Sequence, residues 1–316
     1  MKLFCLDATR PLGERIAADA GVPLAAHEER EFEDSEFKVR PLEGVAGERV
    51  FVCQTLSGDA RGSASDKLCR LLFFVGALKD DGAAEVIALV PYLAYSRKDR
   101  RTKPHDPITT RYVAALFEAV GVDVVVTVDV HNPAAFENAF RCRKVHVEAA
   151  PLLVEHFAAR LAADERVVVL SPDAGGMKRA QRFAAALEER TGRAVELAVM
   201  EKQRSEGRVS GEAFAGDVAG AAVIIVDDLV SGGTTLARAA RAAVARGARA
   251  VHAAATHGVL GKGAAETLAL PELDSLVLTD TAGDPLARCP SLGPKLTVLG
   301  SAPLLAAAIA ALSGAS

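Results

Sequence analysis

The sequence predicts an α/β fold with two similar domains, and each domain contains a mostly parallel sheet flanked by helices. Three observations predict it. Short runs rich in β-branched residues recur along the chain, segments with helical spacing lie between them, and a strand that ends in acidic residues occurs once in each half. Runs this continuously apolar are typical of strands that helices cover on both faces. In such folds, ligands bind beyond the carboxyl ends of the strands.

The predicted elements alternate from strand to helix. We expect a first domain over 1–148 and a second over 149–316, whose last segment can pack back on the first domain. Residues 201–212, EKQRSEGRVSGE, have no apolar periodicity and predict a mobile surface loop. The predicted strands span 50–53, 86–91, 124–130, 167–171, 223–226 and 250–255, and the predicted helices span 66–78, 109–119, 178–189 and 235–246.

Composition excludes several classes of function. The 316 residues are 50% hydrophobic, which suffices for a large core, and 37 basic against 41 acidic residues leave a net charge of −4. This balance gives no general excess of positive charge for holding nucleic acid. Five scattered cysteines without CxxC spacing argue against a disulfide framework and indicate a reducing cytoplasm. Because no apolar run is long enough to cross a bilayer, we expect no membrane partner.

The most specific segment is VIIVDDLVSGGTTLARAARAAV, residues 223–244. A buried strand delivers two adjacent carboxylates, Asp227 and Asp228, which would repel a phosphate and therefore suit the hydroxyls of a sugar. The turn that follows joins converging backbone N–H groups to a helix N-terminus and predicts a phosphate cradle. A phosphorylated pentose fits both parts, although an ordinary capped turn is the alternative. The cradle residues are Ser231, Gly232, Gly233, Thr234 and Thr235.

Several ordered motifs together resemble one known family. Residues 227–236 resemble the phosphoribosyl-pyrophosphate loop of the type I phosphoribosyltransferase superfamily. Further segments are similar to those of the ribose-phosphate pyrophosphokinases, so that the match runs nearly end to end. The resemblance implies a transfer of the β,γ-diphosphoryl group of ATP to the 1-hydroxyl of ribose 5-phosphate, giving 5-phosphoribosyl 1-diphosphate and AMP. The further segments are REFEDSEFKV (30–39), VPYLAYSRKDRR (90–101), DPITTRYVAALFEAVGVDVVVTVDVH (106–131), VVVLSPDAGGMKRA (167–180) and AATHGVL (254–260).

The same resemblance implies an ATP site in the first domain. It places Asp34, Ser35 and Glu36 at the adenine and ribose of ATP, often in the site of a neighbouring subunit. Arg97 and Lys98 would contact the nucleotide, and the planar donors of an arginine suit a triphosphate. Without the resemblance, a charge cluster after a strand is typical of a solvated loop.

The resemblance implies that His131 and Asp173 help to hold Mg²⁺ on the phosphates of ATP. Mg²⁺ prefers oxygen ligands, so His131 is expected to act through water or on the phosphate itself. The residues themselves predict that Asp129 and His131 share one face at the carboxyl end of a strand. For Asp173, which precedes a Gly-rich turn and a helix, the alternative is a helix N-cap.

Lys202 and Arg204 are the candidate catalytic residues, and Arg204 is also a candidate contact to ribose 5-phosphate. The resemblance implies that this Lys-x-Arg pair closes over the reacting groups. Attack of the 1-hydroxyl on the β-phosphorus builds negative charge that cations neutralise when water is expelled. Without the resemblance, the segment EKQR is typical of charged residues on a solvent-exposed surface.

Some positions depart from the pattern of the family. Ser35 stands where glycine is frequent, His105 where arginine is common, and Ser231 where many members carry aspartate, so we assume neither control by ADP nor activation by phosphate. The resemblance implies a homo-oligomer, often a hexamer built from dimers. Two other functions stay open at this point: a phosphoribosyltransferase that consumes the diphosphate, and a non-catalytic regulatory homologue.

Overall fold

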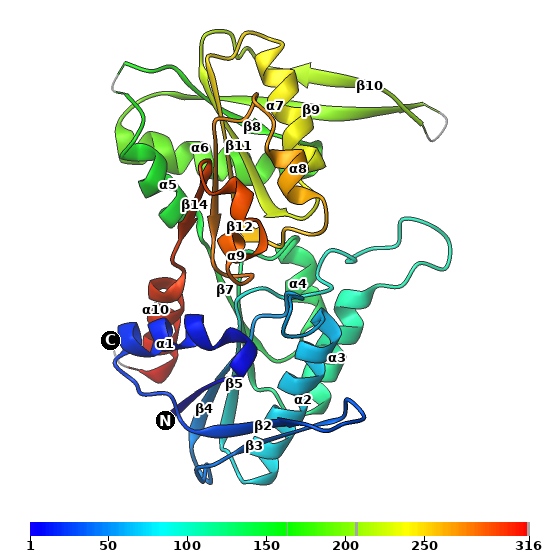
Figure 1. Ribbon diagram of the computed structural model, residues 1–316, viewed down its shortest axis with the longest axis vertical. Helices are drawn as coiled ribbons and strands as arrows, with labels where there is room; N and C mark the ends of the chain where they lie inside the picture. Colours follow the sequence, from blue (N-terminus) through cyan, green and yellow to red (C-terminus); the bar gives the residue numbers. More distant parts are fainter. Residues whose placement is uncertain (163, 206–207, 315–316) are drawn as a thin grey trace. The chain divides into compact units, whose positions relative to one another are not determined.

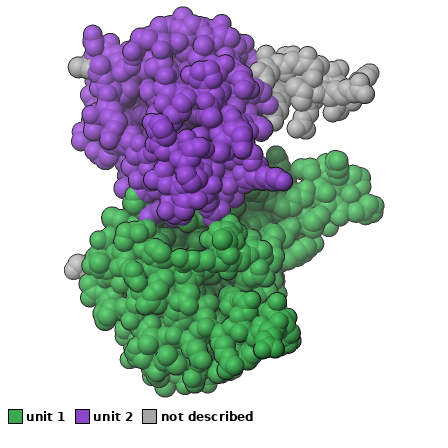
Figure 2. All heavy atoms as spheres, in the orientation of Figure 1, with its two compact units in different colours: residues 1–148, 281–283, 300–316 green, residues 149–280, 284–299 purple. Residues whose placement is uncertain are grey.

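The computed structural model describes the backbone of residues 1–162, 164–205 and 208–314, and the side chains of these residues except 201–205 and 208–212 (Figure 1). The chain divides into two compact units, which are described one at a time. Unit 1 consists of residues 1–148, 281–283 and 300–316, and unit 2 consists of residues 149–280 and 284–299 (Figure 2).

Unit 1 contains a five-stranded sheet whose strands are all parallel. Its order is β1 (Lys2–Cys5), β4 (Arg49–Cys53), β5 (Glu85–Val90), β6 (Val124–Val128) and β7 (Arg143–Val147). The central strands are apolar throughout and buried, as expected of strands covered on both faces. The covering helices are α1 (Arg10–Ala20), α2 (Ala64–Asp80), α3 (Thr109–Ala119), α4 (Pro133–Ala139) and α10 (Ala302–Ser313).

A separate antiparallel hairpin also belongs to unit 1. It pairs β2 (His27–Glu31) with β3 (Phe37–Pro41), and β3 contacts α2. Helix α10, from the end of the chain, packs against α1 from its beginning (Figure 1). The chain therefore returns to unit 1 after it has formed unit 2.

Unit 2 contains a seven-stranded sheet that is parallel except at one edge. Its order is β10 (Arg208–Ala215), β9 (Val195–Ser205), β8 (Val167–Ser171), β11 (Ala222–Val230), β12 (Ala250–Gly258), β13 (Ser275–Thr279) and β14 (Leu296–Leu299), with β10 antiparallel to β9. The helices are α5 (Ala150–Ala158), α6 (Met177–Thr191), α7 (Thr234–Val244), α8 (Ala264–Leu268) and α9 (Pro285–Arg288).

Strand β11 shows why this sheet needs helices on both sides. Val223 and Ile225 pack in a core with the alanines of α7, whereas Ile224 and Val226 pack in a second core with Phe183 of α6. Successive side chains of a strand point to opposite faces, so an unbroken apolar run fills both cores. The predicted fold class is confirmed.

The predicted surface loop over 201–212 is wrong for the backbone that the structure describes there. Residues 201–205 continue β9 and residues 208–212 begin β10, and the two strands pair with each other. A ribbon whose strands pair mainly with each other does not need alternating apolar residues, which explains why the sequence pattern missed it. Among the described helices, none combines the length and the apolar character that a membrane span requires.

Candidate functional site

The carboxylate pair lies near the carboxyl end of β11. Asp227 and Asp228 follow the part of β11 that pairs with β8, which ends at Ile225. The Asp228 side chain is 5% exposed and that of Asp227 is 20% exposed. The Asp227 Oδ1 accepts the backbone N–H of Asp228 at 2.9 Å. Both side chains are therefore held largely out of water.

Arg179, in the first turn of α6, contacts both carboxylates. Its Nη1 lies 3.4 Å from Asp227 Oδ1 and its Nη2 lies 3.5 Å from Asp228 Oδ1. Burial raises the pKa of Asp227 well above its usual range, and the hydrogen bond and charge of Asp228 raise that pKa further, while the guanidinium lowers it. The pair thus resists holding two negative charges unless a donor or cation compensates them.

The turn after these acids leads directly into α7. The helix is preceded by Gly233 at φ +76°, and no side chain among those described caps its first N–H groups. A Cβ at Gly233 would lie 2.6 Å from Cγ of the buried Leu268, whereas one at Gly232 would meet nothing within 4 Å. Gly233 therefore fits its place both by backbone conformation and by packing. Uncapped N–H groups at a helix start suit an anion, as the sequence predicts for Ser231, Gly232, Gly233, Thr234 and Thr235.

Asp173 adopts the alternative that the sequence left open. It is the N-cap of a short 3₁₀ turn, Ala174–Gly176, and its Oδ1 accepts the Gly176 N–H at 3.0 Å. The Ser171 hydroxyl donates to the Asp173 carbonyl at 2.7 Å and lies so close to Gly176 that a Cβ there would approach it to 2.8 Å. Asp173 is nevertheless exposed, so the capping hydrogen bond does not remove its side chain from solvent.

In unit 1, Asp34, Ser35 and Glu36 lie at the exposed tip between β2 and β3. The Asp34 carboxylate accepts the Glu36 N–H at 3.1 Å, and Ser35 has φ +70°. A positive φ is strained for serine and free for glycine, which gives the departure at Ser35 a structural meaning. Next to the tip, the Arg30 guanidinium lies 5.1 Å from the centre of the 41%-exposed Phe32 ring.

Arg97 and Lys98 occupy the segment after β5, but their surroundings differ. Arg97 is exposed, whereas the Lys98 Nζ lies 2.5 Å from Asp106 Oδ2 and donates to the Thr102 hydroxyl at 3.1 Å. Bonds from Lys98, from Thr102 and from the Lys103 N–H hold the pKa of Asp106 well below its usual range. Lys98 therefore already closes the 98–106 loop.

The prediction that Asp129 and His131 share one strand face is wrong. Strand β6 ends at Val128, and Asp129 has φ +35°, which no strand residue adopts. His146 of β7 fixes this turn: its Nε2 accepts the Val130 N–H at 3.1 Å and lies 4.0 Å from Asp129 Oδ1. His131 is exposed in the turn. Asp129 and His131 both follow the carboxyl end of β6, but the alternation of side chains along a strand does not determine where these two side chains point.

The two candidate catalytic residues lie on the paired edge strands of unit 2. Lys202 and Arg204 belong to β9, opposite Glu212 and Val209 of β10. Their side chains lie outside the described residues. His131 belongs to unit 1 and Asp173 to unit 2.

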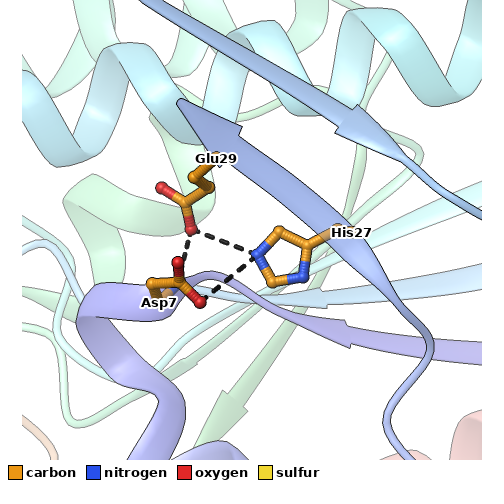
Figure 3. Close-up of side chains that lie close together, drawn as sticks. All are labelled: Asp7, His27 and Glu29. Atoms are coloured by element: carbon orange, nitrogen blue, oxygen red, sulfur yellow. Dashed lines mark hydrogen bonds and ion pairs between the residues drawn. The ribbon is translucent and has the colours of Figure 1, made fainter. Parts of the chain in front are cut away.

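One further cluster of possible metal ligands occurs among the described residues. Asp7, His27 and Glu29 place their ligand atoms within 4.8 Å of one another (Figure 3). The His27 Nε2 lies 3.2 Å from Glu29 Oε1 and 3.7 Å from Asp7 Oδ1. Glu29 also accepts the Asp7 N–H at 2.5 Å and lies 3.7 Å from Arg70 Nη1, so its carboxylate already has partners within the protein.

Three structurally placed residues escaped the sequence prediction of the site. Arg179 contacts Asp227 and Asp228, which lie 48 and 49 positions away, and no local pattern in the sequence indicates this contact. The sequence analysis gave His146 and Asp106 no role in the site, because their roles depend on contacts with Val130 and Lys98 in the folded chain.

Comparison with known proteins covers most of the chain. A family model for the N-terminal domain of ribose phosphate pyrophosphokinase matches residues 1–121, and one for the phosphoribosyl transferase domain matches residues 146–271.

Individual relatives extend this match. The chain is 38% identical to a ribose-phosphate pyrophosphokinase of Hyphomonas neptunium, over 89% of this chain and 87% of that protein. It is 37% identical to a ribose-phosphate pyrophosphokinase of Caldanaerobacter subterraneus, over 98% of this chain and 93% of the relative. Among solved structures, phosphoribosylpyrophosphate synthetase from Mycobacterium smegmatis aligns with a TM-score of 0.89 at 33% identity, covering 100% of this chain and 99% of that one.

Proposed function

The chain belongs to the ribose-phosphate pyrophosphokinase family, and from that premise we propose which of its residues carry the reaction. The enzyme transfers the β,γ-diphosphoryl group of ATP to the 1-hydroxyl of ribose 5-phosphate, giving 5-phosphoribosyl 1-diphosphate and AMP. A new bond forms between the 1-oxygen and the β-phosphorus, and the bond from that phosphorus to the oxygen bridging to the α-phosphorus breaks. The hydroxyl proton must leave as the bond forms.

The ribose 5-phosphate site, in this proposal, is the end of β11 with the turn that follows. The observation that supports it is the succession of two largely buried carboxylates and an uncapped helix start. The carboxylates Asp227 and Asp228 accept hydrogen bonds from the ring hydroxyls, and the helix start donates to the 5-phosphate. The donating residues are Ser231, Gly232, Gly233, Thr234 and Thr235.

The nucleotide site, in this proposal, belongs to unit 1, with Asp34, Ser35 and Glu36 at the adenosine. Arg97 is exposed and donates to the phosphates as a planar fork. Lys98 is already paired with Asp106, so we propose that it contributes to ATP binding chiefly by holding the loop that presents Arg97.

The family's reaction depends on ATP and generally on Mg²⁺. We propose His131 and Asp173 as the residues that help to hold Mg²⁺, which supplies positive charge to the ATP phosphates. Asp173 is exposed and offers carboxylate oxygen, the donor that this ion prefers, although one oxygen also caps a turn. His131 is exposed as well and fits contact through water or with a phosphate.

Lys202 and Arg204 are proposed to stabilise the charge that develops at the β-phosphorus, with Arg204 also contacting the sugar phosphate. Their cationic groups suit equatorial and bridging oxygens in a site from which water is expelled. We expect the Lys202→Ala protein to bind both substrates and to lose most turnover. Near-normal turnover in that protein would remove the assignment.

The assignment of sites is tested with purified protein, Mg²⁺, ribose 5-phosphate and a panel of nucleoside triphosphates, following which monophosphate appears. AMP release that requires ribose 5-phosphate is expected. The Asp227→Asn and Asp228→Asn proteins should lose affinity for ribose 5-phosphate with little change in affinity for ATP. Diphosphate release that needs a free base instead would indicate a phosphoribosyltransferase, and inactivity of the protein alone would favour a regulatory homologue.

We further propose a cytoplasmic homo-oligomer. The described cysteines are all free, which suits a reducing compartment. Large apolar side chains such as Phe73, Tyr112 and Leu116 are about half exposed or more in the single chain, at 59%, 55% and 47%. Light scattering on purified protein would measure the assembly, and a monomer at enzyme-assay concentration would contradict this proposal.

A further inference from the structure

Arg179 occupies a distinctive place in unit 2. It is the third residue of α6, and its guanidinium reaches the end of the neighbouring strand β11. One nitrogen lies near each carboxylate, at 3.4 Å from Asp227 and 3.5 Å from Asp228. The side chain is 29% exposed, so a cation stands at the border between the buried pair and solvent.

The same guanidinium also lies beside the Asp173 turn. The point at which a Cβ on Gly176 would stand is 3.7 Å from Arg179 Nη1 and 3.7 Å from Asp173 Oδ1. The guanidinium therefore lies close to both the Asp173 turn and the end of β11.

The contacts to the two acids are long for charge-assisted bonds, whose usual length is about 2.7–2.9 Å. Distances of 3.4 and 3.5 Å indicate attraction without tight bidentate pairing. Carboxylate oxygens held in this way keep lone pairs for another donor, and a sugar hydroxyl is such a donor.

The guanidinium of Arg179 lowers the pKa of Asp227, which burial and Asp228 raise. A carboxyl that burial and a neighbouring acid keep protonated accepts fewer hydrogen bonds from a sugar. Asp228 faces Asp227 from the same strand and Arg179 faces it from α6. On the neighbouring strand β12, Ala255 pairs with Asp227, and His257 pairs with Leu229, two residues further along.

Among the described residues, the part of β8 that pairs with β11 contributes no charge. The residues of β8 that pair with β11 are Val167–Leu170, all apolar, and Asp173 beyond them is itself an acid.

We propose that Arg179 is a positioning residue for ribose 5-phosphate: its guanidinium orients Asp227 and Asp228 so that both accept hydrogen bonds from the ring hydroxyls. The inference rests on the proposed function of the β11 site and adds a residue to it. Arg179 acts through the acids and is not required to touch the sugar.

The test uses the full-length Arg179→Gln and Arg179→Lys proteins. Arg190→Gln is the matched control, because Arg190 lies in the same helix, is exposed and pairs with Glu155. Steady-state kinetics for each substrate are measured from pH 6 to pH 9, and binding of ribose 5-phosphate without ATP is measured by calorimetry.

We expect Arg179→Gln to lower kcat/KM for ribose 5-phosphate near pH 7 by about tenfold for each unit by which the acid limb of the pH profile moves upward. The loss should shrink as the pH rises, because alkali restores the carboxylates. Arg179→Lys should recover part of the loss, KM for ATP should stay within about twofold, and the control should match the wild type.

A pH profile and sugar affinity of Arg179→Gln equal to those of the wild type would overturn the inference. So would an equal, pH-independent loss in the Gln and Lys proteins, since that result indicates a structural role. If the wild type itself neither binds nor converts ribose 5-phosphate, the proposed function fails, and this outcome is recognised without any variant.

Discussion

Replacement of Gly233 by alanine separates the conformational and packing demands of the proposed phosphate turn. The residue has φ +76°, where a side chain costs about 1–2 kcal/mol. Its new Cβ would stand 2.6, 2.9 and 3.0 Å from three carbons of Leu268, which is fully buried and cannot simply swing into solvent. Overpacking of this kind costs about 1–3 kcal/mol. Together the two effects predict a loss of about 2–5 kcal/mol in the free energy of unfolding.

Gly232→Ala is the matched control for this change. The Cβ of that variant meets nothing within 4 Å, and the residue does not have a positive φ, so we expect a loss below about 1 kcal/mol. Because the chain has no tryptophan, unfolding in urea is followed by far-ultraviolet circular dichroism, and hydrogen exchange at the amides of α7 assigns the loss to unit 2.

A double-mutant cycle with Leu268→Ala divides the two contributions. In the Leu268→Ala background, the cost of Gly233→Ala should fall to the conformational part, about 1–2 kcal/mol. Equal losses for the Gly233 and Gly232 variants would refute the reasoning, as would an unchanged cost of Gly233→Ala in the Leu268→Ala background.

Three further predictions follow from single groups. Asp227→Asn should abolish most turnover and should also remove a pH dependence of the stability. Folding raises the pKa of Asp227, so the contribution of this group to stability is present below about pH 4 and is lost as the pH rises. In thermal melts, the variant should therefore gain stability relative to the wild type as the pH increases. Folding lowers the pKa of Asp106, so the contribution of this group to stability is present above about pH 4 and is lost in acid. Asp106→Asn should loosen the loop that Lys98 closes and raise KM for ATP. Unchanged hydrogen exchange of the 98–106 amides in this variant would contradict the prediction. Ser35→Gly relieves a positive φ and should be neutral or stabilising by up to about 1 kcal/mol in urea unfolding, whereas a clear loss would show that the serine hydroxyl contributes.

The core strands could be predicted closely from the sequence. The predicted strand over 167–171 has the observed bounds of β8. The prediction over 50–53 differs from β4 by one residue at its start, and the prediction over 86–91 is shifted from β5 by one residue at both ends. These strands are buried on both faces, so every position along them favours an apolar residue and the sequence shows an unbroken apolar run.

Elements that are paired but little buried left no such pattern. The hairpin of β2 and β3 has charged residues at most positions, and β10 lies at the edge of its sheet, next to β9. Backbone hydrogen bonds join such partners, and most side chains permit those bonds.

At the candidate site, the sequence by itself determined the types of chemical group and their local order: adjacent acids after a buried strand, then small residues, then a helix. These features depend on neighbours along the chain, where period and turn chemistry operate. Only the tertiary structure decided that Arg179 faces Asp227 and Asp228, that Lys98 is engaged by Asp106, and that Asp129 leaves its strand with φ +35°. Such contacts arise when the sheet brings distant turns together, and no periodicity in the chain records which side chains then meet.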